Sequence, residues 1–132
     1  MNFTEFMESY ADEIGGQYSE YDKNKSVIIV PLEDGRFQTV LGIMKHSEKY
    51  GKTGVEFASK VCEFSGDINL IELLRENSNF CHAKFVIVDD YVKVEAATFL
   101  DNVTDELLKE MIVEVANLAD EWEYKLTGLD VH

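Results

Sequence analysis

The C-terminal part of the sequence carries one long helical pattern, and this pattern most constrains the fold. Between Thr104 and Leu126 the apolar residues recur at spacings of three and four: Leu108, Met111, Ile112, Val115, Leu118, Ala119, Trp122 and Leu126. At about 100° per residue they fall within an arc of roughly 140°, which predicts a helix with one apolar face. The opposite face is predicted to be acidic, with Asp105, Glu106, Glu110, Glu114, Asp120, Glu121 and Glu123. Because such a helix is marginal alone in water, it needs an apolar surface to cover.

Five runs with strand character come before this helix and are predicted to form that surface. They span about Ser26 to Leu32, Arg36 to Lys45, Val55 to Phe64, Phe80 to Asp89 and Tyr91 to Leu100. Tight turns are predicted at Glu33-Asp34-Gly35 and at Asp89-Asp90. Pro31 cannot donate to a strand ladder, so it indicates an edge strand or a strand end. The polar stretch from Gln17 to Lys25 lacks either period and is predicted to be a loop.

Two shorter helices complete the pattern. Asn2, with Glu5 three residues on, resembles a capping box at the start of the first helix. Its apolar stripe consists of Phe3, Phe6, Met7, Tyr10 and Ile14, and Gly15-Gly16 ends it. A second helix is predicted from Ile68 to about Glu76, with Asp67 as its N-cap. The order α-β-β-β-α-β-β-α has no repeated βαβ unit, so it predicts a two-layer α+β fold with an antiparallel sheet, in one domain over residues 1–132.

The charge balance bears on possible partners. The chain has 26 acidic and 12 basic residues and a formal net charge of −14. This charge opposes binding to nucleic acid or to an anionic membrane, since both are polyanions. Lys45, Lys49, Lys52 and Lys60 form one local exception. We interpret them as a solvated hairpin with its flanks, and a functional basic patch is the alternative.

The N-terminus is acidic where a signal peptide is positively charged, and no run approaches the roughly 20 apolar residues of a spanning helix. We therefore expect a cytoplasmic protein that does not enter a membrane. Cys62 and Cys81 lie in strand-like runs, so we expect them to be reduced, buried and structural.

Catalytic and cofactor motifs are lacking in the sequence. It contains no phosphate-binding loop and no HExxH, CxxC or GxSxG motif. The histidines, His46, His82 and His132, are scattered. The Asp89-Asp90 pair offers too few oxygens for a hard cation. The sequence therefore predicts a non-enzymatic protein with no cofactor and no metal site.

The second helix has apolar residues around more than one face. Ile68, Leu70, Ile71, Leu73 and Leu74 spread over roughly 220° of its circumference. Leu70, Leu73 and Leu74 suit a sheet, which leaves Ile68 and Ile71 as a possible second interface, for example in a homodimer. The alternative is that the loop with Tyr18 and Tyr21 folds over this side.

A family resemblance is most specific between Asn79 and Leu126. There Asn-Phe-Cys-His-Ala-Lys-Phe-Val-Ile-Val-Asp-Asp is followed by Val-Lys-Val-Glu-Ala, then by Phe-Leu-Asp-Asn-Val-Thr-Asp-Glu-Leu-Leu, and later by Ala119-Asp120 plus an aromatic residue. This succession of segments resembles the C-terminal half of the YbjN-domain family. That family lies within the type III secretion chaperone-like fold, which also includes the Tir-chaperone group. Residues 1–78 resemble this family only in the order of their predicted helices and strands.

The resemblance implies a five-stranded antiparallel sheet in the order 1-2-3-5-4, flanked by three helices. It also implies binding to extended, partly unfolded segments of a client, usually as a dimer, or a regulatory role. It carries no catalytic residues to this chain. The leading hypothesis is therefore a non-enzymatic module, chaperone-like or regulatory, that binds a segment of a protein partner.

Two alternatives stay open. One is a small-molecule-binding or enzymatic domain with a pocket between helix and sheet, near His82, Tyr91 or Cys81. The other is a purely structural subunit of a larger assembly.

Overall fold

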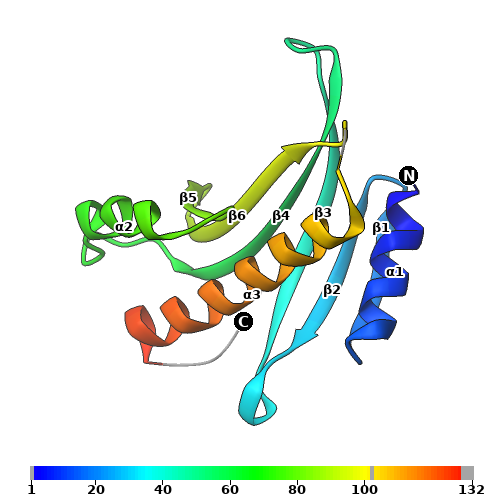
Figure 1. Ribbon diagram of the computed structural model, residues 1–132. Helices are drawn as coiled ribbons and strands as arrows, with labels where there is room; N and C mark the ends of the chain where they lie inside the picture. The colour runs from blue at the N-terminus through cyan, green and yellow to red at the C-terminus, as the bar shows by residue number, and fades with distance from the viewer. Residues whose placement is uncertain (1, 102, 129–132) are drawn as a thin grey trace.

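Residues 2–101 and 103–128, which the computed structural model describes, form one six-stranded antiparallel sheet with two of the three α-helices packed on one side (Figure 1). The elements follow in the order α1 (Phe3–Glu13), β1 (Gln17–Asp22), β2 (Lys25–Pro31), η1 (Glu33–Gly35), β3 (Phe37–Ser47), β4 (Lys52–Glu63), α2 (Leu70–Glu76), η2 (Asn77–Asn79), β5 (Lys84–Val88), β6 (Tyr91–Phe99) and α3 (Asp105–Thr127). The predicted α+β class with an antiparallel sheet is therefore confirmed.

The sheet has the strand order β1-β2-β3-β4-β6-β5 and so differs in detail from the expected five-stranded one. The additional edge strand is β1, which lies where the sequence predicts a loop. Its residues are exposed except for the partly buried Tyr18, and all but Tyr18 and Tyr21 are strongly polar, so it has no hydrophobic alternation to reveal it. Its pairing with β2, in which Tyr18 lies opposite Ile28, depends on backbone hydrogen bonds that no side-chain pattern reports.

Helix α1 forms where its cap and its apolar stripe predict it. The side chain of Asn2 accepts a hydrogen bond of 3.0 Å from the backbone N–H of Glu5. The helix buries Phe3, Phe6, Met7, Tyr10 and Ala11 against β1 and β2. A Cβ atom at position 42 of β3 would lie 2.6 Å from Cε of Met7, so Gly42 leaves space for the helix side chains.

Helix α3 covers β3, β4 and β6 with the apolar stripe that the sequence predicts. Its N-cap is Thr104, whose hydroxyl accepts from the N–H of Leu107. The predicted acidic face is wrong at one residue, Glu123, which is fully buried. It follows the buried Ala119 by four positions, and therefore lies on the apolar face. No helix within the described part of the chain has the length and apolar character needed to cross a membrane.

Helix α2 differs most from its prediction. Its N-cap is Asn69 rather than Asp67, and the side chain of Asn69 accepts from the N–H of Glu72. In Figure 1 this helix stands away from α1 and α3, beyond the end of the sheet near β5. It buries Leu73 alone, whereas Leu70 and Leu74 are 40% and 69% exposed. The expectation that Leu70 and Leu74 pack on the sheet is therefore wrong, because the helix projects beyond it.

Both predicted tight turns are confirmed. Asp34 and Asp89 each adopt a positive φ, of 59° and 54°, which a short polar residue tolerates in a turn. Pro31 is the last residue of β2, which lies between β1 and β3. Pro31 therefore marks a strand end, and the edge-strand alternative is wrong.

Candidate functional site

The side of the sheet away from α1 and α3 is a candidate binding surface, and we call it the open face. Cross-strand pairing places its residues, because directly opposed side chains share a face. Its apolar members are Tyr21, Val27, Ile29, Phe37, Leu41, Ile43, Ala58, Val86, Val88, Tyr91, Ala97 and Phe99. Phe37 is 50% exposed and Tyr21 is 70% exposed. Contiguous apolar side chains that meet solvent in this way are typical of a binding surface.

The open face also concentrates positive charge. Its lysines are Lys25, Lys45, Lys52, Lys60, Lys84 and Lys93. Its carboxylates are Asp22, Glu56, Glu63 and Glu95, of which Asp22 and Glu63 end their strands. The face thus holds six of the 12 basic residues of the chain and four of its 26 acidic ones. Its charge is opposite in sign to that of the whole protein.

Two hollows lie along this face. One of about 460 Å³ is lined by Tyr21, Val27, Phe37, Thr39, Leu41, Ala58, Ser59, Lys60 and Lys93. The other, of about 520 Å³, is lined by Lys45, His46, Ser47, Gly54, Val55, Glu56, Ala97, Thr98 and Phe99. Both follow β3, the first near Phe37 and the second near Ser47. At about 3.4 Å per residue the two ends are roughly 34 Å apart, the length of about ten extended residues.

A carboxyl pair, Glu56 and Glu95, lies at the second hollow, which Glu56 lines. Partial burial, a hydrogen bond that the protonated Glu95 carboxyl donates to Glu56, and the charge of Glu56 raise the pKa of Glu95 to about 7, against the opposing effect of Lys45 and Lys93. Nζ of Lys45 lies 3.0 Å from Oε2 of Glu56. Near neutral pH the Glu95 carboxyl is thus partly protonated, which makes the open face more positive still.

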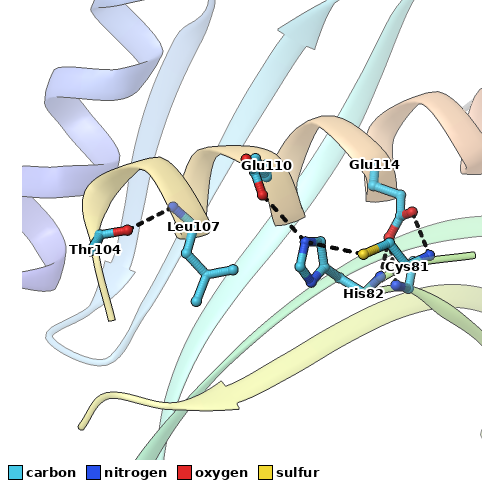
Figure 2. A network of polar contacts seen from close by, with 7 residues as sticks. Cys81, His82, Thr104, Leu107, Glu110 and Glu114 are labelled. Atoms are coloured by element: carbon cyan, nitrogen blue, oxygen red, sulfur yellow. Dashed lines mark hydrogen bonds and ion pairs between the residues drawn. The ribbon is translucent and has the colours of Figure 1, made fainter. Parts of the chain in front are cut away.

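A second polar cluster connects α3 to the loop before β5 (Figure 2). The carboxylate of Glu114 accepts three backbone N–H bonds, from Cys81 at 2.9 Å, His82 at 2.7 Å and Ala83 at 2.6 Å. Partial burial works to raise the pKa of Glu114, but these three bonds outweigh it and the pKa is lowered. The arrangement explains Glu114 as a structural anchor that fixes the start of β5.

The thiol and imidazole in this cluster do not form a proton relay. Nε2 of His82 lies 3.7 Å from Sγ of Cys81 and 3.4 Å from Oε2 of Glu110, as Figure 2 shows. A relay from a nucleophile through a base to a carboxylate uses both ring nitrogens, whereas here one nitrogen faces both partners. Cys81 is also exposed, contrary to prediction, because β5 begins only at Lys84. Cys62 is buried as predicted, and burial followed by the charge of Glu123 raises the pKa of its thiol.

The residues of the predicted helix–sheet pocket are not brought together. Tyr91 lies on the open face with Nζ of Lys60 4.2 Å from its ring centroid, whereas Cys81 and His82 face α3. A hollow of about 350 Å³ does lie between α1, α3 and the end of β2, and Tyr10, Val30 and Val113 are among its lining residues. None of the three predicted residues lines it.

The remaining candidate residues are dispersed. His46 is exposed near the end of β3, and His132 lies outside the described residues. Ile71 is 61% exposed on α2, and Ile68, which precedes the helix, packs partly against the core. An interface formed by these two residues stays a prediction. Among residues 2–101 and 103–128, no group of three or more His, Cys, Asp or Glu side chains is placed to hold a metal ion.

Sequence reasoning did not identify the open face, although a signal for it was present. In β3, Phe37, Leu41 and Ile43 alternate with Val40 and Met44, so the strand is apolar on both sides. An antiparallel strand with one solvated side has a polar side instead. Comparison with protein-family models and with curated protein sequences finds no match for this chain.

Proposed function

We propose that this protein is a non-enzymatic protein-interaction module, chaperone-like or regulatory, that binds a segment of a partner protein on the open face of its sheet. The observation that carries the proposal is the combination of exposed apolar side chains and lysines on the side that α1 and α3 leave uncovered.

Burial of the apolar residues would supply much of the binding free energy. Complete burial of a large apolar side chain contributes about 1.5 to 3 kcal/mol. Phe37 and Phe99 are already partly covered, at 50% and 37% exposure, so each has about 1 kcal/mol left to contribute. Several such residues along β3 and β6 suffice for a specific, reversible complex once the cost of ordering the partner is subtracted.

The shape of the face favours an extended segment as its ligand. The two hollows follow β3 from one end to the other, and a segment of about ten residues in extended conformation spans them. Its alternate side chains would point into the face, as in other modes of extended-peptide recognition.

The family resemblance agrees with this proposal. We infer a secretion chaperone-like fold in which β2, β3, β4, β6 and β5 correspond to the expected 1-2-3-5-4 sheet, and β1 extends its edge. Binding of extended client segments is what that resemblance implies for function. Dimer formation through Ile68 and Ile71 is a separate proposal, which a mass measurement in solution tests.

Site-specific photo-crosslinking tests the proposed function. A photoreactive residue replaces Phe37 on the open face, and in a matched variant it replaces Tyr124, which is 68% exposed on α3. Both variants are expressed in the native host and irradiated, and the crosslinked peptide is identified by mass spectrometry. We expect one defined partner segment to be crosslinked to position 37 and not to position 124.

Equal adducts at both positions, or none at position 37, would contradict the proposal. A crosslinked peptide from this chain itself would identify the open face as a contact between two copies. The unirradiated sample and the wild-type chain serve as background controls.

A further inference from the structure

The chemistry of the open face points to one class of partner. Building on the proposed function, we infer that the segment bound there is acidic and apolar, with carboxylates that pair with Lys60 and Lys93 beside apolar side chains that enter the adjoining hollow.

The strongest observation is the position of these two lysines. Lys60 of β4 and Lys93 of β6 are directly opposite one another, so their side chains leave the sheet on the same side. Like charges at directly opposed positions destabilise a sheet. In the part of the chain that the structure describes, neither lysine has a carboxylate oxygen within ion-pair distance, and Nζ of Lys60 lies instead over the ring of Tyr91. Lys93 acts on Glu95 at longer range, and the carboxyl of Glu95 is partly protonated near neutral pH because its pKa is raised to about 7. A carboxylate between them would relieve the repulsion and satisfy both ammonium groups.

The surroundings of the two lysines specify the rest of the ligand. Lys60 and Lys93 border the hollow of about 460 Å³, whose other walls include Val27, Phe37 and Leu41. A ligand that reaches both regions needs an anionic group and apolar groups within a few residues of each other. In a peptide, Asp or Glu next to Leu, Ile, Val or Phe provides this combination.

The charge of the whole molecule makes this pairing selective. At −14 the protein repels acidic segments from most of its surface, so the lysines of the open face are where such a segment can be accepted. The repulsion also disfavours a long polyanion such as nucleic acid, which would extend beyond the lysines onto acidic surface. Face-to-face pairing of two copies is disfavoured too, because each copy would bring the same opposed lysines.

Selection from a random peptide library tests the inference. The full chain is used as bait, and ten-residue peptides are enriched at moderate ionic strength and sequenced. We expect enriched peptides with net negative charge and two or more large apolar residues. Binding of a selected peptide should weaken roughly tenfold in the K60Q/K93Q double variant, and it should weaken as salt is added.

A matched control removes two lysines from another surface. K109Q/K125Q has the same net charge as K60Q/K93Q, but its lysines lie on α3, where they pair with Glu13 and Glu121. We expect it to bind the selected peptide as the wild type does. Replacing Glu by Gln in the peptide should reduce binding to the level seen with K60Q/K93Q.

Several results would overturn the inference. These are enrichment of neutral or basic peptides, failure to enrich any peptide, an equal loss in both lysine variants, or complete displacement of the peptide by a single-stranded oligonucleotide of equal length. If the natural segment crosslinked at position 37 proves to be basic or uncharged, this inference fails while the proposed function stands. If nothing is crosslinked there, the proposed function itself fails.

Discussion

Strand β3 presents apolar side chains on both of its sides, and the two sides have different surroundings. Val40 is fully buried beneath the helical layer, whereas Phe37 on the opposite side is 50% exposed. The buried side also contains polar groups with defined partners, since Nε2 of Gln38 donates to Oγ of Ser59 at 3.1 Å. The open face instead has lysines, several of which have no carboxylate partner among the described residues. The buried side forms the core that folding requires, and we attribute the apolar residues of the other side to the proposed binding of a partner segment.

The largest expected effect comes from the buried side. Phe57 of β4 is fully buried and its ring centroid lies 6.1 Å from that of Phe3 of α1. Phe57→Ala should lower the free energy of unfolding by about 3 to 5 kcal/mol, because it removes packed atoms and leaves a cavity between sheet and helix. Urea unfolding followed by circular dichroism measures the change.

The comparison for this variant is Leu41→Ala, a large-to-small change on the open face of the neighbouring strand. Leu41→Ala should lower the free energy of unfolding by less than half as much as Phe57→Ala does. If the two substitutions were equally destabilising, the open face would be part of the folding core and the contrast between the two sides would not hold.

A smaller loss is expected where the loop before β5 is fastened to α3. Glu114→Gln replaces one accepting oxygen by an NH₂ group, which cannot accept from Cys81, His82 and Ala83 as the carboxylate does. We expect a loss of about 1 to 2 kcal/mol. Since the pKa of Glu114 is lowered on folding, the wild-type contribution is present above the ordinary carboxyl pKa and disappears as the pH falls through the lowered value.

Unfolding curves at pH 7 and in the acid range distinguish this effect from general acid destabilisation. The difference between wild type and Glu114→Gln should shrink as the pH falls. A difference that is constant with pH would assign the loss to packing alone. Hydrogen exchange at the amides of residues 81–83 should be faster in the variant.

Glu95 provides a pH effect of opposite sign on the open face. Because the folded state raises its pKa from 4.5 to about 7, the folded protein binds a proton between these values that the unfolded chain releases. The contribution of Glu95 to stability therefore falls as the pH rises through this range. Glu95→Gln should stabilise the protein at pH 8 by about 1 kcal/mol, allowing for solvent screening, and should change little at pH 5.

Removing any carboxylate also reduces the repulsion within an acidic chain, so a control is needed. Glu20→Gln on the exposed edge strand β1 reports that general effect. If Glu95→Gln and Glu20→Gln gave the same dependence on pH, the pair with Glu56 would have no special role.

The smallest stability effect is expected at Phe37, a half-exposed residue of the proposed binding surface. Phe37→Ser should lower the free energy of unfolding by no more than about 1 kcal/mol, because half of the side chain is already exposed. It should nevertheless reduce the affinity for a selected acidic peptide several-fold, because Phe37 lines the hollow next to Lys60 and Lys93. A thermal shift measurement and a peptide titration on the same sample separate the two effects. Unchanged affinity would remove Phe37 from the binding surface.

Local features of this protein could be predicted from the sequence, and features that depend on strand register could not. The caps at Asn2 and Thr104 act within three residues, so their signals are complete in the sequence. Alternation within β3 and β4 assigns each residue to a side of its own strand. It does not reveal that Lys60 faces Lys93, since their pairing joins positions 33 residues apart in the sequence across the β4–β6 register.

The errors have physical causes of the same kind. The apolar pattern of helix α2 predicts a sheet-facing side. The helix instead projects beyond the sheet, and only its Leu73 is buried. To predict the open face, one must know that α1 and α3 both pack on the same side of the sheet. That choice depends on the handedness and length of the connections, which composition and period do not specify.

The edge strand β1 has a further consequence for the protein in a crowded cell. A free strand edge offers unpaired backbone groups to any other extended chain, and apolar edges of this kind initiate aggregation. The exposed side chains of β1 are mostly polar, and Glu20 and Asp22 add negative charge along it. The composition that hides this strand from sequence analysis therefore also disfavours the pairing of another chain at the β1 edge of the sheet.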